Sequence, residues 1–224
     1  MAKKTVVVGL SGGVDSSVSA YLLKEAGYEV KALFMKTWQS EPGEGCTSEL
    51  DFKDASEVCD RLEIPLHKAN VSDEYWDRVF TNFLSEHEKG RTPNPDVLCN
   101  REIKFKSFLD YAFEIGADYI ATGHYAKISN KDGRFYLARA KDLNKDQTYF
   151  LHEVSENDFS KCLFPLENLM KSEVRDIALK NNLVTANKKD SVGICFVGEK
   201  NLKDFLNRFI EFKKGNIKGE NNNV

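Results

Sequence analysis

The residues best suited to chemistry lie near the N-terminus, in the stretch Gly9-Leu10-Ser11-Gly12-Gly13-Val14-Asp15-Ser16. They follow a β-branched run from Thr5 to Val8 and precede a helical pattern, so the sequence predicts a strand, a tight loop and a helix. Backbone N–H groups at a helix N-terminus attract anions, and glycines let a phosphate approach closely. Asp15 can cap the helix or hold Mg²⁺. The stretch therefore predicts a phosphate site.

The loop differs from the two commonest nucleotide motifs. It lacks the lysine of Gly-x-x-x-x-Gly-Lys-Ser/Thr and has no Gly-x-Gly-x-x-Gly. The alternative is a βα turn that merely uses two glycines. Ser-Gly-Gly-Val-Asp-Ser instead resembles the pyrophosphate loop of the N-type ATP pyrophosphatases, which implies that ATP is cleaved to AMP and pyrophosphate while a substrate oxygen is adenylated.

Strands and helices alternate along the first half of the chain. Further strands are predicted over residues 28–35, 64–71 and 118–122, and helices over 52–62, 73–87 and 171–183. A hairpin is predicted around Asn130 to Gly133. The fold class is therefore α/β, a doubly wound parallel sheet like that of the adenine nucleotide alpha hydrolases. We expect an α/β domain over 1–140, a helical extension over 141–212 and a flexible tail over 213–224.

Ligands of such sheets bind beyond the carboxyl ends of the strands. This rule brings together the loop after the first strand, Met35 at the end of the second and Gly123 after the fourth. Met35 could lie against an adenine ring, although ordinary edge packing is an equal alternative. Gly123 could let a ribose or base approach the backbone. His124 is expected to be structural or adjacent to the nucleotide, rather than a base.

Two cysteines lie in loop-like contexts. Cys99 follows Asp96 by three residues and precedes Arg101, ahead of a helix predicted to begin near Glu102. A thiol at a helix N-terminus beside arginine has a reason to ionise, and Asp96 could exchange a proton with it. Cys195 follows a Lys-Lys-Asp-Ser turn. A cysteine taken singly is more often a buried small hydrophobe than a nucleophile, but the loop contexts favour chemistry here. The three remaining cysteines receive no chemical role: Cys46, Cys59 and Cys162.

Four ordered motifs carry a more specific resemblance. They are Gly90 to Asp96 with Leu98-Cys99-Asn100, Ala121 to Ala126, Lys145-Asp146-Gln147 with Tyr149-Phe150-Leu151, and Asp190-Ser191 with Gly193 to Phe196. Together they resemble the tRNA-specific 2-thiouridylase family, whose members thiolate C2 of the wobble uridine of tRNA at the expense of ATP. The family normally continues into a linking domain and a β-barrel that contribute to tRNA binding.

The resemblance implies roles for individual residues. Cys195 would carry a persulfide sulfur received from a donor protein, and Cys99 would assist its release and end disulfide-bonded to Cys195. Asp96 would act as acid or base. Asn94, Pro95 and Asp96 would contact the target base, and Lys145, Asp146 and Gln147 would contact tRNA. ATP and Mg²⁺ are the implied cofactors, and the target base must leave its stack to reach the site.

Composition limits the alternatives. A net charge of −3 argues against generic nucleic-acid binding, and no apolar run reaches the length of a membrane span, so we expect a cytoplasmic protein without membrane contact. Two other functions stay open: an amide-forming ligase acting on a small molecule, and a non-catalytic RNA-binding form. Some related thiolases use an iron–sulfur cluster, which Cys99, Cys195 and a third ligand such as Asp96 could hold.

Overall fold

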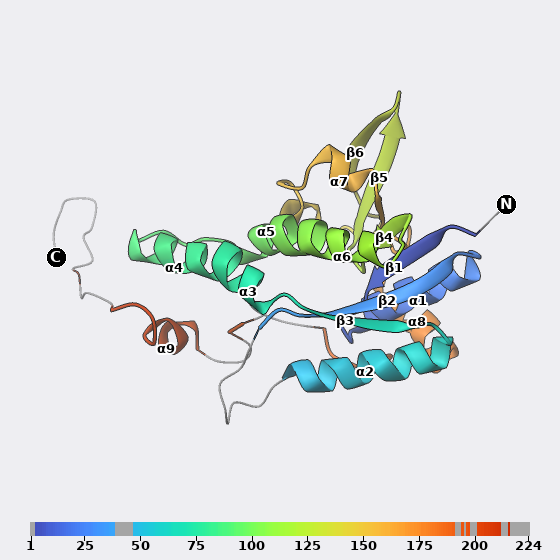
Figure 1. Cartoon of the computed structure of the whole chain (residues 1–224), viewed down its shortest axis with the longest axis horizontal. Coiled ribbons are helices and arrows are strands. Elements are labelled where there is room, and N and C mark those ends of the chain that lie inside the picture. The colour runs from blue at the N-terminus through green and yellow to red at the C-terminus, as the bar shows by residue number, and fades with distance from the viewer. Residues whose placement is uncertain are drawn as a thin grey trace.

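The chain is described by a computed structural model, which covers residues 3–38, 47–190, 194, 196–197, 201–211 and 215 (Figure 1). Its centre is a five-stranded sheet in the order β3-β2-β1-β4-β7, and every pairing in it is parallel. The strands are β1 (Thr5–Gly9), β2 (Glu29–Lys36), β3 (Leu66–Asn70), β4 (Tyr119–Ala121) and β7 (Cys162–Leu163). The strand order reverses at β1, because β2 and β4 pair with its two sides. The predicted doubly wound parallel sheet is confirmed.

Both faces of the sheet are covered by helices. Successive side chains of a strand point to opposite faces. Val7 accordingly belongs to a core shared with the helical segments between residues 72 and 114, while Val6 and Val8 belong to a second core. That second core is shared with α1 (Val14–Glu25), α2 (Thr47–Leu62) and α8 (Lys171–Lys180). Figure 1 shows α6 on one side of the strands and α2 on the other.

The helix predicted over residues 73–87 is present as one continuous helical segment with a π-helical middle. It consists of α3 (Ser72–Tyr75), a π-helical turn (Trp76–Phe80) and α4 (Thr81–Glu88). Its buried side carries Tyr75, Val79, Phe80 and Phe83. The apolar spacing therefore predicted the segment, whereas the wider π turn was not predicted.

The stretch that contains Asp96 and Cys99, whose sequence context is loop-like, is helical from Pro95 onwards. α5 (Pro95–Leu98) continues through a π-helical segment (Cys99–Ser107) into α6 (Phe108–Glu114). Asn94 is its N-cap and accepts a hydrogen bond from the Asp96 N–H at 3.1 Å. Proline suits the first helical position, because its fixed φ is helical and no hydrogen bond is lost there. The prediction that Cys99 precedes a helix beginning near Glu102 is therefore wrong; Cys99 lies in the second turn.

The second predicted helix begins earlier than expected. α2 starts at Thr47, whereas the sequence predicted loop structure as far as Leu50. Two carboxylates of its first half, Asp51 and Asp54, contact the Lys188 ammonium, at 2.7 Å in the case of Asp51. Acidic residues suit the first half of a helix because of the helix dipole, and this tertiary contact adds to that preference. Cys46 lies outside the described residues.

The second half of the chain completes the same cores. β5 (Ala126–Lys131) and β6 (Arg134–Arg139) form the predicted hairpin through Asp132 and Gly133, whose φ angles are 53° and 78°. Two positive φ values are those of the turn that suits a two-residue hairpin. A 3₁₀ turn (Thr148–Phe150), α7 (Glu156–Phe159) and α9 (Leu202–Leu206) follow in order.

The stretch predicted as a helical extension, residues 141–212, also supplies β7 to the sheet and α8 to the core beside α1. β7 was not predicted, because two residues carry no periodic signal. The domain division at residue 140 stays a prediction. Within the part of the chain that the structure describes, no helix is both long enough and apolar enough to span a membrane.

Candidate functional site

The loop between β1 and α1 presents an uncapped helix N-terminus. Gly13 is the N-cap of α1, and no side chain caps the helix there. The hydroxyls of Ser16 and Ser17 both donate to the Gly13 carbonyl, at 3.1 and 2.8 Å, and Ser16 Oγ also accepts from the Ser11 N–H. These serines therefore hold the shape of the loop. The N–H groups of the first helical turn have no intrahelical acceptor, which is the arrangement that binds phosphate.

The glycines of this region serve different purposes. A Cβ atom on Gly12, whose φ is +74°, would lie 2.3 Å from the Asp51 carbonyl oxygen of α2. A Cβ on Gly123 would lie 2.8 Å from backbone atoms of Asp15 and Ser16. Gly123 therefore lets the first turn of α1 pack on the end of β4. A Cβ atom on Gly13 would have only Ser11 Oγ near it, at 3.6 Å. Gly13 is therefore the glycine that leaves space at the helix N-terminus.

Asp15 is directed at charged and polar partners rather than at its own helix. Its carboxylate accepts hydrogen bonds from Lys171 Nζ at 2.7 and 2.8 Å and from the Tyr125 hydroxyl at 2.9 Å. Burial, with the nearby Asp15 charge, raises the pKa of Tyr125, so its phenol stays protonated and donates. The cap role predicted for Asp15 is not seen.

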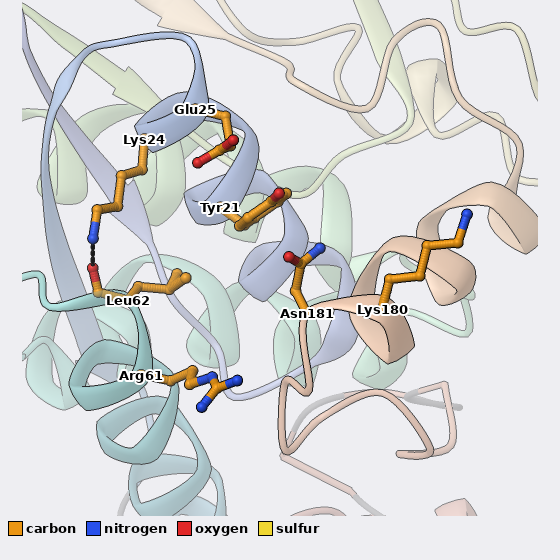
Figure 2. Close-up of a pocket in the computed structure, with 7 residues that line it drawn as sticks. All are labelled: Tyr21, Lys24, Glu25, Arg61, Leu62, Lys180 and Asn181. Carbon is orange, nitrogen blue, oxygen red and sulfur yellow. Dashed lines mark hydrogen bonds between the residues drawn. The ribbon is translucent and has the colours of Figure 1, made fainter.

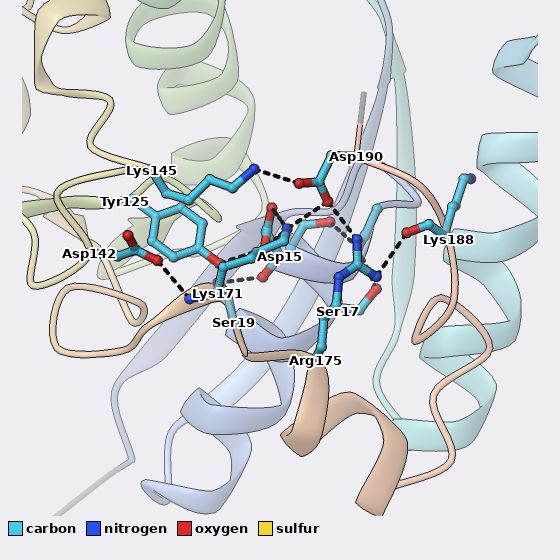
Figure 3. Close-up of polar contacts among 12 residues, drawn as sticks. Asp15, Ser17, Ser19, Tyr125, Asp142, Lys145, Lys171, Arg175, Lys188 and Asp190 are labelled. Atoms are coloured by element: carbon cyan, nitrogen blue, oxygen red, sulfur yellow. Dashed lines mark hydrogen bonds and ion pairs between the residues drawn. The ribbon is translucent and has the colours of Figure 1, made fainter. Parts of the chain in front are cut away.

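Lys171 lies between two acids. Besides Asp15, its ammonium contacts Asp190 Oδ1 at 3.0 Å, and the Lys171 side chain is only 13% exposed. Lys145 and Arg175 contact the same Asp190 carboxylate, each at 2.7 Å. Figure 3 shows Lys145 and Arg175 directed at Asp190, whereas Lys171 and Tyr125 contact Asp15. We call Asp15, Tyr125, Lys145, Lys171, Arg175 and Asp190 the Asp15–Lys171 cluster.

The charges of this cluster are strongly coupled. Burial of the Asp190 carboxylate opposes its ionisation, but hydrogen bonds from Lys145 and Lys171 outweigh it and lower the pKa to about 2. Each of the three cations thus already contacts a carboxylate, although three cations facing two carboxylates leave the cluster with a net positive charge. An incoming polyphosphate would compete with Asp15 and Asp190 for the same ammonium groups.

The start of α8 is fixed by two acids, which holds Lys171 in place. Asp142, only 3% exposed, accepts the Lys171 backbone N–H at 2.8 Å. Glu173 accepts the Met170 N–H at 2.6 Å. Sequence reasoning missed both Lys171 and Asp142. A glutamate three residues after the N-cap marks the helix start, but no local signal links Lys171 to Asp15, which lies 156 residues earlier.

Asp96, Cys99 and Asn100 share the first turns of the helix that begins at Pro95. Burial raises the pKa of the Asp96 carboxyl, and Lys104 opposes this effect. Cys99 is buried at 8% exposure. Asn100 donates from Nδ2 to the Asp96 carbonyl at 2.9 Å, while its buried Oδ1 has no hydrogen-bond partner among the described residues. Asp96 and Cys99, three positions apart, lie on one side of the helix.

The stretch Lys145-Asp146-Gln147 lies between the Asp15–Lys171 cluster and α5. Lys145 bonds to Asp190, and Asp146 accepts the Thr148 hydroxyl at 2.7 Å. Gln147 pairs twice with Tyr125: its N–H donates to the Tyr125 carbonyl at 2.9 Å, and its Oε1 accepts the Tyr125 N–H at 3.0 Å. The following 3₁₀ turn contacts α5. The structure thus brings the two predicted tRNA-contacting stretches together.

Two further predicted positions lie at the carboxyl edge of the sheet. Met35, near the end of β2, is half-buried against the core on the α3–α6 side. His124 Nδ1 lies 2.7 Å from the Thr122 hydroxyl, and complete burial lowers its pKa well below the ordinary value, so the imidazole is neutral. A neutral, enclosed imidazole suits the structural role expected for His124.

Cys195 lies outside the described residues, so its distance to Cys99 and Asp96 is not described. No group of three or more His, Cys, Asp or Glu side chains is arranged to hold a metal ion in the described ranges. The iron–sulfur alternative includes Cys195 and stays open. A shallow surface pocket lies elsewhere, where α1, α2 and α8 end (Figure 2). Its cations Lys24, Arg61 and Lys180 offset the dipoles of those helix C-termini, so we assign it no ligand.

Curated relatives match nearly the whole chain. A protein of Legionella pneumophila (strain Lens) named tRNA-specific 2-thiouridylase MnmA is 59% identical over 217 residues, which cover 96% of this chain and 60% of that protein. A protein of Geobacillus kaustophilus named tRNA-specific 2-thiouridylase MnmA 1 is 57% identical over 97% of this chain and 59% of its own length. The chain thus spans about three fifths of the length of these relatives.

Solved structures share the fold at low sequence identity. A 4-thiouridine synthetase–RNA complex with bound ATP gives a TM-score of 0.58 at 17% identity, over 92% of this chain and 50% of that chain. The U34-tRNA thiolase NcsA from Methanococcus maripaludis, with its [4Fe-4S] cluster, gives 0.53 at 21% identity, over 87% and 61%. A family model described as tRNA methyl transferase HUP domain matches residues 4–199. The chain therefore belongs to the tRNA methyl transferase HUP domain family.

Proposed function

We propose that this chain is the ATP-using catalytic part of a tRNA-specific 2-thiouridylase, which replaces the C2 oxygen of the wobble uridine by sulfur. The names of relatives at 55–59% identity support the reaction. The observation that carries it in the structure is the uncapped N-terminus of α1 with the Asp15–Lys171 ion pair beside it. We place the reaction in the reducing cytoplasm, which suits the unpaired buried thiols of Cys59 and Cys162.

The adenylation step uses the phosphate loop. The first-turn N–H groups of α1 would hold the ATP phosphates, and Met35 and Gly123 would lie near the adenosine. The uridine O2 attacks the α-phosphorus, and pyrophosphate leaves. The phosphates would compete with Asp15 for the Lys171 ammonium. This ammonium would then offset part of their negative charge.

Asp15 is the residue that would hold Mg²⁺. The contacts of Lys171 support this assignment, because its ammonium lies within hydrogen-bond distance of both oxygens of the Asp15 carboxylate. The two oxygens are thus placed to contact a cation. Mg²⁺ is commonly bound through one or two carboxylates together with substrate phosphates, where it neutralises their charge.

The sulfur-transfer step uses the two cysteines. A donor protein would load the Cys195 thiol as a persulfide. The Cys99 thiolate would attack the inner sulfur and form a disulfide with Cys195, and the released outer sulfur would displace AMP from C2. An external thiol would then reduce the disulfide. Asp96 supports this step, because burial favours its protonated form and lets it deliver a proton.

Substitution of Lys171 tests the adenylation site. Lys171→Ala should lower ATP-dependent pyrophosphate release with tRNA by about 100-fold or more, because removing one preorganised charge from a transition state typically costs this much. Lys171→Arg should retain part of the rate. Lys141→Ala is the matched control, because Lys141 pairs with Glu173 at the same end of α8 but is 49% exposed. Undiminished pyrophosphate release by folded Lys171→Ala would refute the assignment.

The reaction itself is tested with ATP, Mg²⁺, a persulfide donor and unmodified tRNA. Mass spectrometry of the tRNA nucleosides should show 2-thiouridine, and Cys99→Ser should abolish it while leaving pyrophosphate release. If Cys99→Ser and Cys195→Ser keep full activity on a small amine substrate instead, the chain is an amide-forming ligase.

A further inference from the structure

We propose that Tyr149 is a stacking platform for an unpaired base beside the target uridine, a proposal that rests on the function proposed above. Tyr149 lies in the 3₁₀ turn Thr148–Phe150 and is 59% exposed. Its ring centroid lies 4.0 Å from that of Phe150, with 36° between the ring planes. A large aromatic ring that is exposed on one side and supported by another ring is available for a flat ligand.

The backbone under Tyr149 is held in place on both sides. The Phe150 N–H donates to the Gln147 carbonyl at 3.1 Å, and the Leu151 N–H donates to the Thr148 carbonyl at 3.0 Å. Leu151 is completely buried. The ring is therefore presented by a fixed turn, so little conformational entropy is lost when a ligand binds it.

The position of this turn links Tyr149 to both halves of the site. Gln147, two residues earlier, is bonded twice to the backbone of Tyr125, whose hydroxyl donates to Asp15. On the other side the turn contacts α5, which carries Asp96. A ligand on Tyr149 would thus border the space between the phosphate loop and the helix of Asp96 and Cys99.

The charges near the ring favour a base over a phosphate. Arg101, a cation of the helix that carries Asp96, is paired with Glu153 at 2.6 Å and with Glu102 at 2.8 Å. His152 is directed back at the Tyr149 carbonyl, with Nδ1 at 2.8 Å. The exposed face of the Tyr149 ring is thus available for stacking, while the charged side chains named here are paired with one another. Bases of a single-stranded RNA loop stack on such faces irrespective of sequence.

Binding of RNA to the full chain tests the platform. The probe is a fluorescein-labelled RNA hairpin with the unmodified anticodon loop, and a blunt RNA duplex is the comparison. Tyr149→Ala should weaken hairpin binding by about 5- to 100-fold, the range expected for loss of one base–aromatic stack. Tyr149→Phe should bind within about twofold of the native chain, because stacking needs the ring and not the hydroxyl. Duplex binding should not change.

Tyr136→Ala is the matched control, since Tyr136 is 49% exposed but lies on β6 of the hairpin. At saturating tRNA, Tyr149→Ala should release pyrophosphate at the native rate, so that only the KM for tRNA rises. Native hairpin affinity of Tyr149→Ala overturns the platform and leaves the proposed function standing. If Tyr149→Ala binds RNA with native affinity but takes up sulfur from the donor protein more slowly, this face binds the donor protein. That result also overturns the stacking platform. Absence of tRNA-dependent pyrophosphate release by the native chain overturns the proposed function itself.

Discussion

At the scale of single residues, the proposed phosphate site contains cations that are paired with carboxylates before any ligand arrives. Lys171, Lys145 and Arg175 lie on Asp15 and Asp190, and no cation of this cluster is left unpaired. Such pairing avoids leaving half-buried cations without a counter-charge, which would be costly. If ATP binds here as proposed, its phosphates must replace carboxylate contacts, so ATP affinity and the stability of the ligand-free chain would depend on the same side chains.

Asp190→Asn should lower the free energy of unfolding by about 1–2 kcal/mol at pH 7, a value reduced for the partial exposure of the carboxylate. The folded-state pKa of Asp190 is lowered to about 2. A lowered pKa stabilises the fold above the unfolded-state pKa of a carboxyl, about 3.9, and this contribution is lost as the pH falls towards 2. Urea unfolding at several pH values should show the difference shrinking below about pH 4. An equal difference at pH 7 and pH 3 would contradict this explanation, and exposed Asp110→Asn is the control.

At the scale of elements, the helix that begins at Asn94 decides how Asp96 and Cys99 are presented. The Asn-Pro pair starts the helix early, so both residues lie on helical turns rather than on a loop. From Cys99 the helix widens into a π-helical segment, which contains Phe105 at a non-helical φ of −111° and ψ of 16°. π-helical turns occur frequently at functional sites. Here the segment directly follows the turn that carries the predicted acid or base.

Asn94→Ala should destabilise the chain by about 1 kcal/mol, because the Asp96 N–H loses its cap. It should also lower the rate of thiolation, since Asp96 moves with that N–H. Asn94→Ser keeps the cap and should recover stability. If Asn94→Ser also recovers the rate of thiolation, the helix cap explains the effect of Asn94→Ala. If the rate stays low, the Asn94 side-chain amide contacts the target base. Ser155→Ala removes the equivalent cap of α7 and should cost stability alone. Denaturant unfolding and single-turnover thiolation measure the two effects.

At the scale of the whole molecule, an aromatic cluster joins segments that are distant in sequence. Phe196 is 4% exposed and lies within 6.0 Å, centroid to centroid, of Trp38, Tyr75, Phe80 and Phe83. These rings come from the end of β2 and from the α3–α4 helical segment. The C-terminal part of the chain is therefore attached to the sheet domain at the residue that directly follows Cys195 in sequence.

Phe196→Ala should lower the free energy of unfolding by about 3–5 kcal/mol, the usual cost of removing a buried phenyl ring. Phe196→Leu should cost less, because much of the volume is retained. Leu202→Ala, at a position that is 38% exposed, should change stability by about 0.5 kcal/mol or less. Denaturant unfolding measures all three. Equal stability of Phe196→Ala and Leu202→Ala would show that the cluster does not hold this segment.

Much of the architecture could be predicted from local pattern. β1 and α1 followed from the valine run and the glycine loop, and the hairpin followed from Asp132-Gly133. The errors were those of boundaries and weak signals. The start at Thr47 was missed because periodicity defines the ends of a helix less sharply than its middle, and β7 was missed because it is two residues long.

The sequence by itself determined the parallel α/β fold and the glycine loop, because periodicity and turn chemistry act over neighbouring residues. Its motifs also pointed to a sulfur-transfer enzyme through resemblance. Only the tertiary structure decided which side chains meet: that Lys171 binds Asp15 and that Gly123 makes room for α1 rather than standing open at this edge. The physical reason is that these contacts join residues far apart in the chain, so no local pattern encodes them.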